Sequence, residues 1–250
     1  MKTNYHTHTV RCNHASGNER EYIEKAIERG LDTIGFSDHS PYFFDGDHYS
    51  NFRMKREQVE EYVSTLASLR EEYKDKIKIL IGYEAEYYPK YFSKFIDFID
   101  GYGYDYLILG QHVLGNEDSH SSAVATDKEE HLARYVDQTA EGLASGKFLY
   151  FAHPDIINYT GDEHIYRKHI TRLCENAKAL GVPLEINMLG ILDKRHYPSD
   201  RFFEIVAEVG NDTVIGCDAH WPDAVAEQTA LEGANELAKR YGLKPLERLL

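Results

Sequence analysis

Histidines recur in this sequence in patterns that suit metal binding. The segment Tyr5-His6-Thr7-His8 places two imidazoles two residues apart, and His14 follows six residues later. Residues two apart on a strand point to the same side, so His6 and His8 can reach one ion. A lone His-x-His pattern is more often a polar turn than a ligand pair, so the interpretation depends on further donors.

The ends of other predicted strands supply such donors. Six of the seven predicted strands end in an imidazole or a carboxylate, and independent accidents at so many ends are improbable. A shared metal centre explains them together. The candidate ligands are His6, His8, His14, His39, Glu84, His112, His153, Asp218 and His220.

Nine candidate ligands are too many for one ion, because zinc or manganese takes about four to six ligands including solvent. The set predicts two or three divalent ions, and mixed nitrogen and oxygen donors suit zinc, manganese or iron. Ions about 3.5 to 4 Å apart can bridge a hydroxide and clamp a phosphoryl group. This arrangement favours hydrolysis of a phosphate ester.

The elements that must position these donors form a repeat of strand and helix. Short runs rich in Val, Ile, Tyr and Phe alternate with longer stretches of helical periodicity. Strands are predicted over 2–6, 33–37, 77–84, 105–110, 148–153, 183–187 and 213–218. Helices are predicted over 19–29, 56–73, 90–100, 128–145, 163–180, 199–209 and 223–241.

The connections favour a barrel. Three strand-to-helix segments, 40–55, 113–127 and 188–198, are long, and such loops usually build the working face of parallel βα architectures. Seven units suggest an α/β fold closed into a barrel with one unit fewer than the common eight. An open doubly wound sheet is the alternative. No linker or composition shift divides the chain, so one domain over 1–250 is predicted.

The amino-acid composition limits the kinds of partner that the protein can bind. Lys and Arg number 28 against 42 Asp and Glu, a net charge of −14, which opposes binding to phosphate backbones and anionic membranes. Three scattered cysteines without a Cys-x-x-Cys pattern fit a reducing compartment. Neither a secretory signal nor a long apolar run is found. We therefore expect a cytoplasmic protein with no nucleic-acid or membrane partner.

The order and spacing of the candidate ligands resemble the polymerase and histidinol phosphatase (PHP) superfamily, in particular its stand-alone histidinol-phosphatase type. The resemblance covers essentially the whole chain. It rests on His6-x-His8 with His14, Asp38-His39, Glu84, His112, Ala152-His153-Pro154-Asp155 and Gly216-Cys217-Asp218-Ala219-His220. It implies a distorted seven-stranded (β/α)7 barrel related to the TIM barrel. It also implies hydrolysis of L-histidinol phosphate to L-histidinol and phosphate, in histidine biosynthesis.

The resemblance further implies how the ligands divide among the ions. Glu84 is expected to bridge the first and second ions. The first ion is expected to take His6, His8, Glu84 and Asp218, the second Glu84, His112 and His153, and the third His14, His39 and His220.

The expected reaction is attack of a metal-bridging hydroxide on phosphorus, in line with the ester oxygen. Arg195, in the long loop 190–198, is predicted to clamp the phosphate oxygens in a bidentate manner. Its alternative role is a solvated surface arginine. Arg167, near the start of a predicted helix, is a second candidate clamp, although a solvated helix face suits it better. Asp218 or His220 could protonate the leaving group.

Some residues keep two interpretations. Glu86 shares a strand face with Glu84 and is either a rival bridging ligand or an orienting group. Asp38 and Asp155 adjoin ligands and could orient them through hydrogen bonds.

Two sets of loop residues are also open. The aromatic residues of the segment 40–55 either cover the substrate as a lid or pack onto the barrel. They are Tyr42, Phe43, Phe44 and Tyr49. Acidic loop residues could receive the ammonium group of the substrate, namely Asp45, Asp47, Glu117 and Asp118.

Other functions compatible with the ligand set come from two classes. One is another PHP-type phosphoesterase: a protein-tyrosine phosphatase, a nucleotide phosphoesterase or an exonuclease. The charge of −14 argues against the exonuclease. The other is a non-catalytic metal-binding barrel, which only turnover distinguishes from an enzyme.

Overall fold

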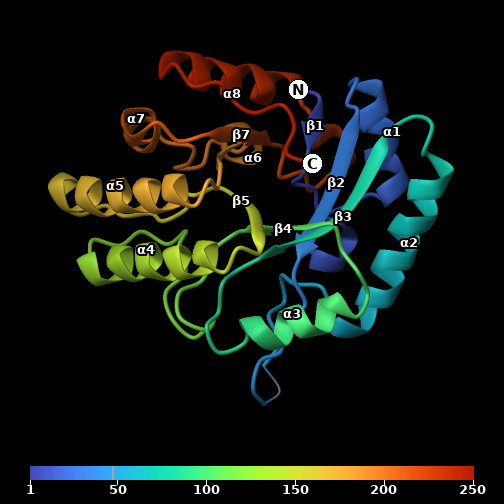
Figure 1. Ribbon diagram of the computed structural model, residues 1–250, viewed down its shortest axis with the longest axis horizontal. Coiled ribbons are helices and arrows are strands. Elements are labelled where there is room, and N and C mark those ends of the chain that lie inside the picture. Colours follow the sequence, from blue (N-terminus) through green and yellow to red (C-terminus); the bar gives the residue numbers. More distant parts are fainter. Residues whose placement is uncertain (47) are drawn as a thin grey trace.

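A computed structural model describes residues 1–46 and 48–250 of the chain. Seven parallel strands form the centre of the fold. Helices surround these strands (Figure 1). The strands are β1 (Thr3–Asn4), β2 (Thr33–His39), β3 (Lys78–Ala85), β4 (Tyr106–Leu109), β5 (Phe148–Phe151), β6 (Leu184–Asn187) and β7 (Thr213–Gly216). The α-helices are α1 (Glu19–Glu28), α2 (Val59–Glu72), α3 (Phe92–Asp100), α4 (Glu129–Ala144), α5 (Glu163–Ala179), α6 (Met188–Leu192), α7 (Asp200–Val209) and α8 (Gln228–Arg240).

The strands follow one another in chain order, from β1 to β7, around a nearly closed barrel. Thr7 and Ala219, just beyond β1 and β7, form a parallel bridge across the remaining gap. The amide of His8 donates to the carbonyl of Ala219 at 2.9 Å, and the amide of Ala219 donates to the carbonyl of His6 at 3.2 Å. The predicted seven-stranded barrel is confirmed. The doubly wound alternative is wrong, because the strand order of a doubly wound sheet reverses direction at one point, whereas these strands keep the chain order throughout.

Local sequence signals explain the helices. Asn18 and Glu21 form a reciprocal capping box at the start of α1. Helix α3 buries Phe92, Phe95, Ile96 and Ile99, a spacing that places all four on one face against the barrel. The predicted helices are found with ends shifted by a few residues. The exception is α6, a short helix within the predicted loop 188–198, where the side chain of Asn187 accepts from the amide of Gly190.

A second, smaller core fills the inside of the barrel below the strand ends that carry histidines. We call it the barrel floor, and its members are Tyr5, Leu80, Tyr106, Ile108, Tyr150, Ala152 and Val214. The C-terminal segment closes this side, since the amides of Leu249 and Leu250 donate to the Tyr5 hydroxyl at 2.9 and 3.2 Å. The opposite side, where the strands end, we call the mouth. No helix in the described part of the chain is long and apolar enough to cross a membrane.

Candidate metal centre

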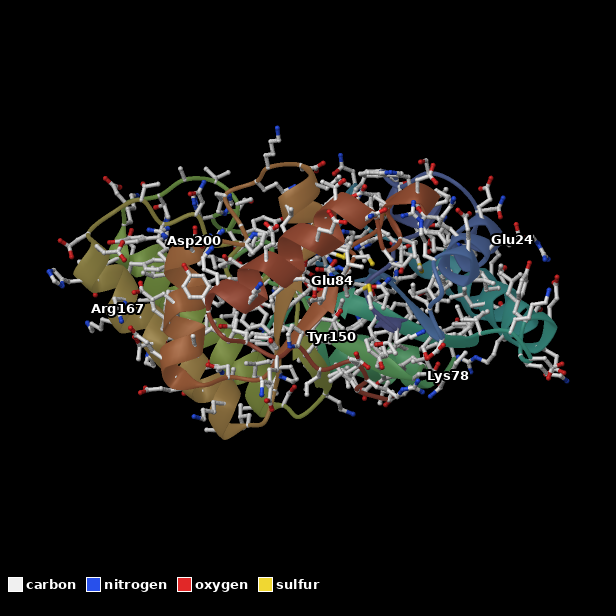
Figure 2. All side chains as sticks on the ribbon, turned by 90° about the horizontal axis from the view of Figure 1, so that it is seen from above. Glu24, Lys78, Glu84, Tyr150, Arg167 and Asp200 are labelled. Carbon is white, nitrogen blue, oxygen red and sulfur yellow. The ribbon has the colours of Figure 1, made fainter. Side chains whose placement is uncertain are left out.

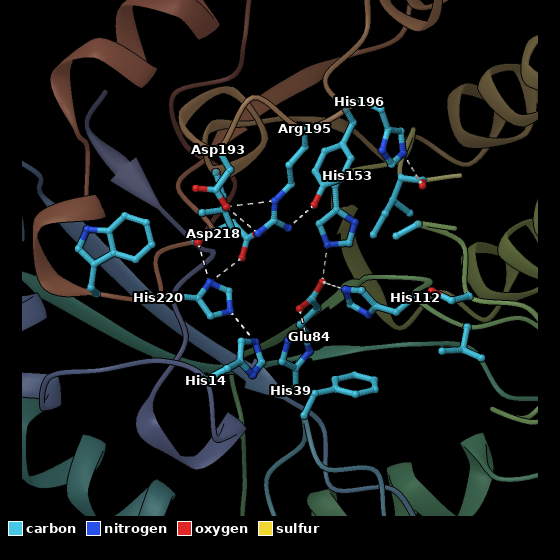
Figure 3. Close-up of a pocket in the computed structure, with 18 of the residues that line it drawn as sticks. His14, His39, Glu84, His112, His153, Asp193, Arg195, His196, Asp218 and His220 are labelled. Carbon is cyan, nitrogen blue, oxygen red and sulfur yellow. Dashed lines mark hydrogen bonds and ion pairs between the residues drawn. The ribbon is translucent and has the colours of Figure 1, made fainter. Parts of the chain in front are cut away.

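A cavity of about 760 Å³ opens at the mouth and collects most of the predicted ligands (Figure 3). Its wall includes His14, His39, Glu84, His112, His153, Asp218 and His220. His6 and His8 lie directly beneath, with no exposed surface. The structure thus brings all nine predicted ligands to one end of the barrel.

The innermost group joins the end of β1 to the ends of β3 and β7. His6 Nε2 lies 3.6 Å from Glu84 Oε2 and 3.4 Å from Asp218 Oδ1. His8 Nε2 lies 3.5 Å and 3.1 Å from the same two oxygens. These spacings exceed ordinary hydrogen bonds for most pairs and leave the four donors facing a common point, as predicted for the first ion.

A second group lies on the other side of Glu84. His153 Nε2 lies 2.7 Å and His112 Nε2 3.4 Å from Glu84 Oε1. Each oxygen of this carboxylate therefore faces a different set of imidazoles, which is the geometry expected of a bridging ligand.

The outer group consists of imidazoles from three segments. His14 Nε2 and His220 Nε2 are 3.0 Å apart, and Figure 3 shows both rings facing the cavity. His39 Nδ1 lies 3.1 Å from Glu84 Oε2. His8, His39 and His220 also offer nitrogens within 4.8 Å of one another, so His8 lies between the inner and outer groups.

Two of the candidate ligands have an unusual backbone conformation. His153, two residues beyond β5, has φ 30°, and Asp218, two residues beyond β7, has φ 50°. Residues with side chains rarely adopt positive φ, and such strain clusters at functional sites.

The side chains fit divalent cations because buried atoms lack partners. His6 Nε2, His8 Nε2, His39 Nδ1 and Glu84 Oε2 are buried without a hydrogen bond. Leaving such atoms unpaired costs about 1–3 kcal/mol each. Coordination to a cation would satisfy them.

The pKa values of the site residues also indicate that the site favours positive charge. Burial opposes ionisation of Glu84 and Asp218, but the surrounding imidazoles hold the pKa of both carboxyls well below the usual range. Burial also opposes protonation of His8, yet Asp218 and Asp38 raise its pKa to about 9. Burial lowers the pKa of His220 to about 3, so the ring stays neutral and keeps a lone pair on one nitrogen for a cation. A bound cation would take the place of protons on His6 and His8, because an imidazole ligates in its neutral form.

Hydrogen bonds on the far side of the rings fix their direction. Glu185 Oε1 lies 2.8 Å from His6 Nδ1, and Glu86 Oε1 lies 2.7 Å from His112 Nδ1. Metal-binding histidines commonly donate their second ring nitrogen to a carboxylate in this way. Glu86 therefore has the contact of an orienting group, and Asp38 approaches His8 Nδ1 at 3.5 Å.

Glu185 is the orienting residue that sequence reasoning missed. It lies in β6, fully buried, and its Oε2 accepts from the amide of His153 and from the side chain of Asn187, both at 2.9 Å. Asn187 also donates to Asp218 at 3.1 Å. A charged residue inside an otherwise apolar strand was the available signal.

Residues 4–189 match the family model described as PHP domain. This span is more than half of the chain. The chain belongs to the PHP domain family.

Individual relatives extend the similarity beyond the matched span. A probable histidinol-phosphatase of Deinococcus radiodurans is 29% identical over 88% of this chain and 86% of its own length. A histidinol-phosphatase of Lactococcus lactis is 26% identical over 97% of this chain and 96% of its own length. The crystal structure of a Lactococcus lactis histidinol phosphate phosphatase complexed with zinc, L-histidinol and phosphate superposes with a TM-score of 0.75. It is 24% identical, covering 98% of this chain and 95% of that one.

The two arginines predicted to clamp phosphate lie in different places in this PHP domain. Arg195 lines the cavity, where its guanidinium donates to the Tyr197 hydroxyl at 2.7 Å and to Asp193 at 2.8 Å. Arg167 lies on the outside of α5, where it pairs with Glu208 of α7. Figure 2 shows Arg167 at the edge of the molecule, far from Glu84. The candidate clamp role of Arg167 is corrected in favour of its alternative, the outer face of a helix, because this side of α5 faces the acidic surface of α7.

The loop residues with open roles also lie away from the cavity. Tyr42 stacks on Phe95 of α3 with ring centroids 4.9 Å apart, so this part of 40–55 packs onto the barrel. Of the acidic loop residues, Asp45 pairs with Lys90 and Glu117 with Arg53. Asp118 Oδ1 accepts from the amide of Asn116. The cavity wall includes none of these three, and Asp47 lies outside the described residues.

Proposed function

We propose that this PHP domain is a metal-dependent phosphomonoesterase that hydrolyses L-histidinol phosphate to L-histidinol and phosphate. The observation that carries the proposal is the mouth itself, where seven imidazoles and two carboxylates meet with buried atoms left unpaired. Relatives that match almost their full length are named histidinol-phosphatases. A Lactococcus lactis relative of the same fold was crystallised with zinc, L-histidinol and phosphate.

The proposed ligand sets follow the three groups in the structure. His6, His8, Glu84 and Asp218 would hold one ion, Glu84 with His112 and His153 a second, and His14, His39 and His220 a third. When bound, divalent ions neutralise phosphoryl oxygens and lower the pKa of water towards neutrality. The mixed donors suit zinc, manganese or iron.

The protein's own groups complete the site. Arg195 faces the cavity with a planar set of donors that can grip two phosphoryl oxygens. Its contacts with Asp193 and Tyr197 keep the guanidinium beside the cavity when no phosphate is present. Asp218 and His220 border the cavity, and one or the other is proposed to relay a proton from water to the leaving alkoxide, since the low pKa of each leaves neither protonated at rest.

The cavity wall provides for the rest of the substrate. Phe52, Ile156, Leu189 and Trp221 contribute apolar surface, which excludes water from the reacting phosphate ester. A volume of about 760 Å³ lies in the range of small-molecule sites. This favours a compact phosphate monoester over a polymer.

The proposed partner is a small molecule, and the proposed location is the cytoplasm. The net charge of −14 opposes binding to nucleic acids and anionic membranes. The free cysteines Cys12, Cys174 and Cys217 are buried, which agrees with a reducing compartment.

Turnover of a substrate panel by metal-loaded protein tests the proposal. The panel holds L-histidinol phosphate, a phosphotyrosine peptide, nucleoside monophosphates and single-stranded DNA, and elemental analysis gives the metal content. We expect the largest kcat/KM with L-histidinol phosphate. A hundredfold preference for a nucleotide would overturn the substrate, whereas fully loaded protein without turnover would indicate a non-catalytic barrel.

A further inference from the structure

Arg53 is a buried cation that belongs to none of the proposed ligand groups. It lies in the segment between β2 and α2, and only 1% of its surface is exposed. Its guanidinium donates to Glu86 Oε2 at 2.7 Å and to Glu117 Oε2 at 2.6 and 3.0 Å. The Tyr88 hydroxyl accepts a further bond at 3.1 Å. These four bonds hold the guanidinium inside the protein rather than on its surface.

One of these contacts leads directly to a proposed metal ligand. Glu86 uses Oε2 for Arg53 and Oε1 for His112 Nδ1, each at 2.7 Å. The other ring nitrogen, His112 Nε2, faces Glu84 Oε1 at 3.4 Å. The direction of His112 therefore depends on the Glu86 carboxylate, whose plane the guanidinium fixes from the opposite side.

The same segment forms part of the cavity wall. The Arg53 guanidinium lies 4.4 Å from the ring centre of Phe52, a cation–π distance. Phe52 borders the cavity and meets the rings of His39 and His112 edge to face, at 5.3 and 6.0 Å. The amide of Met54 donates to the carbonyl of His39 at 3.2 Å. The residues on both sides of Arg53 thus touch proposed ligands.

We propose that Arg53 is a positioning residue for the second metal site: it holds Glu86 so that His112 presents Nε2 to the ion shared with Glu84 and His153. This inference rests on the proposed function. Arg53 touches neither the cavity nor the proposed ligands through its guanidinium, so its effect on His112 passes through Glu86. Glu117 anchors the other side of Arg53 and has no contact with His112 in the described part of the chain.

Metal affinity of folded protein tests the proposal without any substrate. Arg53→Met is compared with Glu117→Gln, which keeps an oxygen acceptor for Arg53 and serves as the matched control. Zinc is titrated against a competing chelator, and circular dichroism and Tm establish folding. We expect Arg53→Met to weaken one zinc site by about 10- to 100-fold, and Glu117→Gln to change it by less than about threefold.

A double variant separates positioning from general stability. If Arg53 acts through Glu86, then Arg53→Met with Glu86→Gln should weaken zinc no more than Glu86→Gln alone. Additive losses would overturn the proposal, as would wild-type affinity in folded Arg53→Met. Should Arg53→Met fail to fold, Arg53→Lys replaces it. An ammonium lacks the planar donors of a guanidinium and would not fix the plane of the Glu86 carboxylate, so wild-type affinity in that variant would equally overturn the proposal.

Discussion

The floor and the mouth of the barrel are built from the same strands but satisfy their polar groups differently. At the floor, the Tyr106 hydroxyl donates to the carbonyl of Tyr5 at 2.7 Å, and the Tyr5 hydroxyl accepts from the last two amides. At the mouth, His6 Nε2 and Glu84 Oε2 are buried without a partner. The tyrosine hydroxyls of the floor find their hydrogen-bond partners within the chain. The buried polar atoms of the mouth lack such partners and are arranged for groups that come from outside the chain.

Glu84→Gln tests this contrast with the largest expected effect. The variant removes the charge that faces both inner groups of imidazoles. Losing several kcal/mol of electrostatic stabilisation should lower kcat/KM by on the order of 10³-fold, and elemental analysis should show fewer bound ions. Tyr106→Phe, at the floor, is the control and should keep both. Glu84→Gln activity within tenfold of the wild type would contradict the assignment.

Asp155, which lies beyond β5 on the mouth side, should make the stability of the protein depend on pH. Burial raises the pKa of this carboxyl to about 6, although the amide of Ser199 donates to it at 2.7 Å. The folded chain keeps a proton that the unfolded chain releases between about pH 4 and pH 6, so stability falls as the pH rises through this window.

Asp155→Asn removes that loss. The free energy of unfolding is measured by urea titration of metal-free protein at pH 4 and at pH 7. Between these pH values, the variant's free energy of unfolding should rise relative to that of the wild type by up to about 3 kcal/mol. An equal difference between the two proteins at both pH values would refute the buried, protonated carboxyl.

Glu185→Gln tests whether orientation of His6 matters to the mouth. It weakens the contact with His6 Nδ1, and changes to such orienting groups typically cost about 10- to 100-fold in metal affinity or activity. Tyr150→Phe removes a 3.2 Å contact to the same carboxylate while leaving the His6 contact in place. Chelator competition should separate the two variants; equal affinities would argue against an orienting role.

Arg195→Ala compares a cavity arginine with an outer one. The loss of charge-assisted bonds to phosphate, about 1.5–3 kcal/mol, should raise KM by roughly 10- to 100-fold and change kcat less. Arg167→Ala should leave both constants unchanged, because its pairing partners are surface glutamates. Steady-state kinetics with L-histidinol phosphate decides, and an unaltered KM would remove Arg195 from the site.

Tyr5→Phe probes the floor and has the smallest expected effect. The amides of Leu249 and Leu250 lose their acceptor, so the free energy of unfolding should fall by about 1 kcal/mol. Metal content and kcat/KM should stay as in the wild type. A drop in metal affinity would show that the two ends of the barrel are less independent than their hydrogen bonds indicate.

Much of the fold and the gathering of ligands could be predicted from sequence, because both depend on local periodicity. Alternating strands and helices fix which residues end each strand, and parallel strands place all such ends together. His6, Glu84 and Asp218 meet for this reason.

Contacts between distant segments could not be predicted in the same way. The helical pattern around Arg167 does not tell which neighbouring helix its side faces, so its pairing with α7 was not foreseen. Glu185 and Arg53 act on rings far away in the chain, and no spacing rule links a strand acid to His6 or a loop arginine to Glu86. These residues emerge only when packing is known.

The seam between β1 and β7 has a further consequence. His6 and His8 follow the first strand and Asp218 follows the last, so the proposed innermost ion would connect the two edges that a short bridge joins. If the proposed ion binds there, barrel closure and its occupancy would be thermodynamically linked, each favouring the other. Chelation should increase hydrogen exchange at the edges of this junction before it affects β3 and β4.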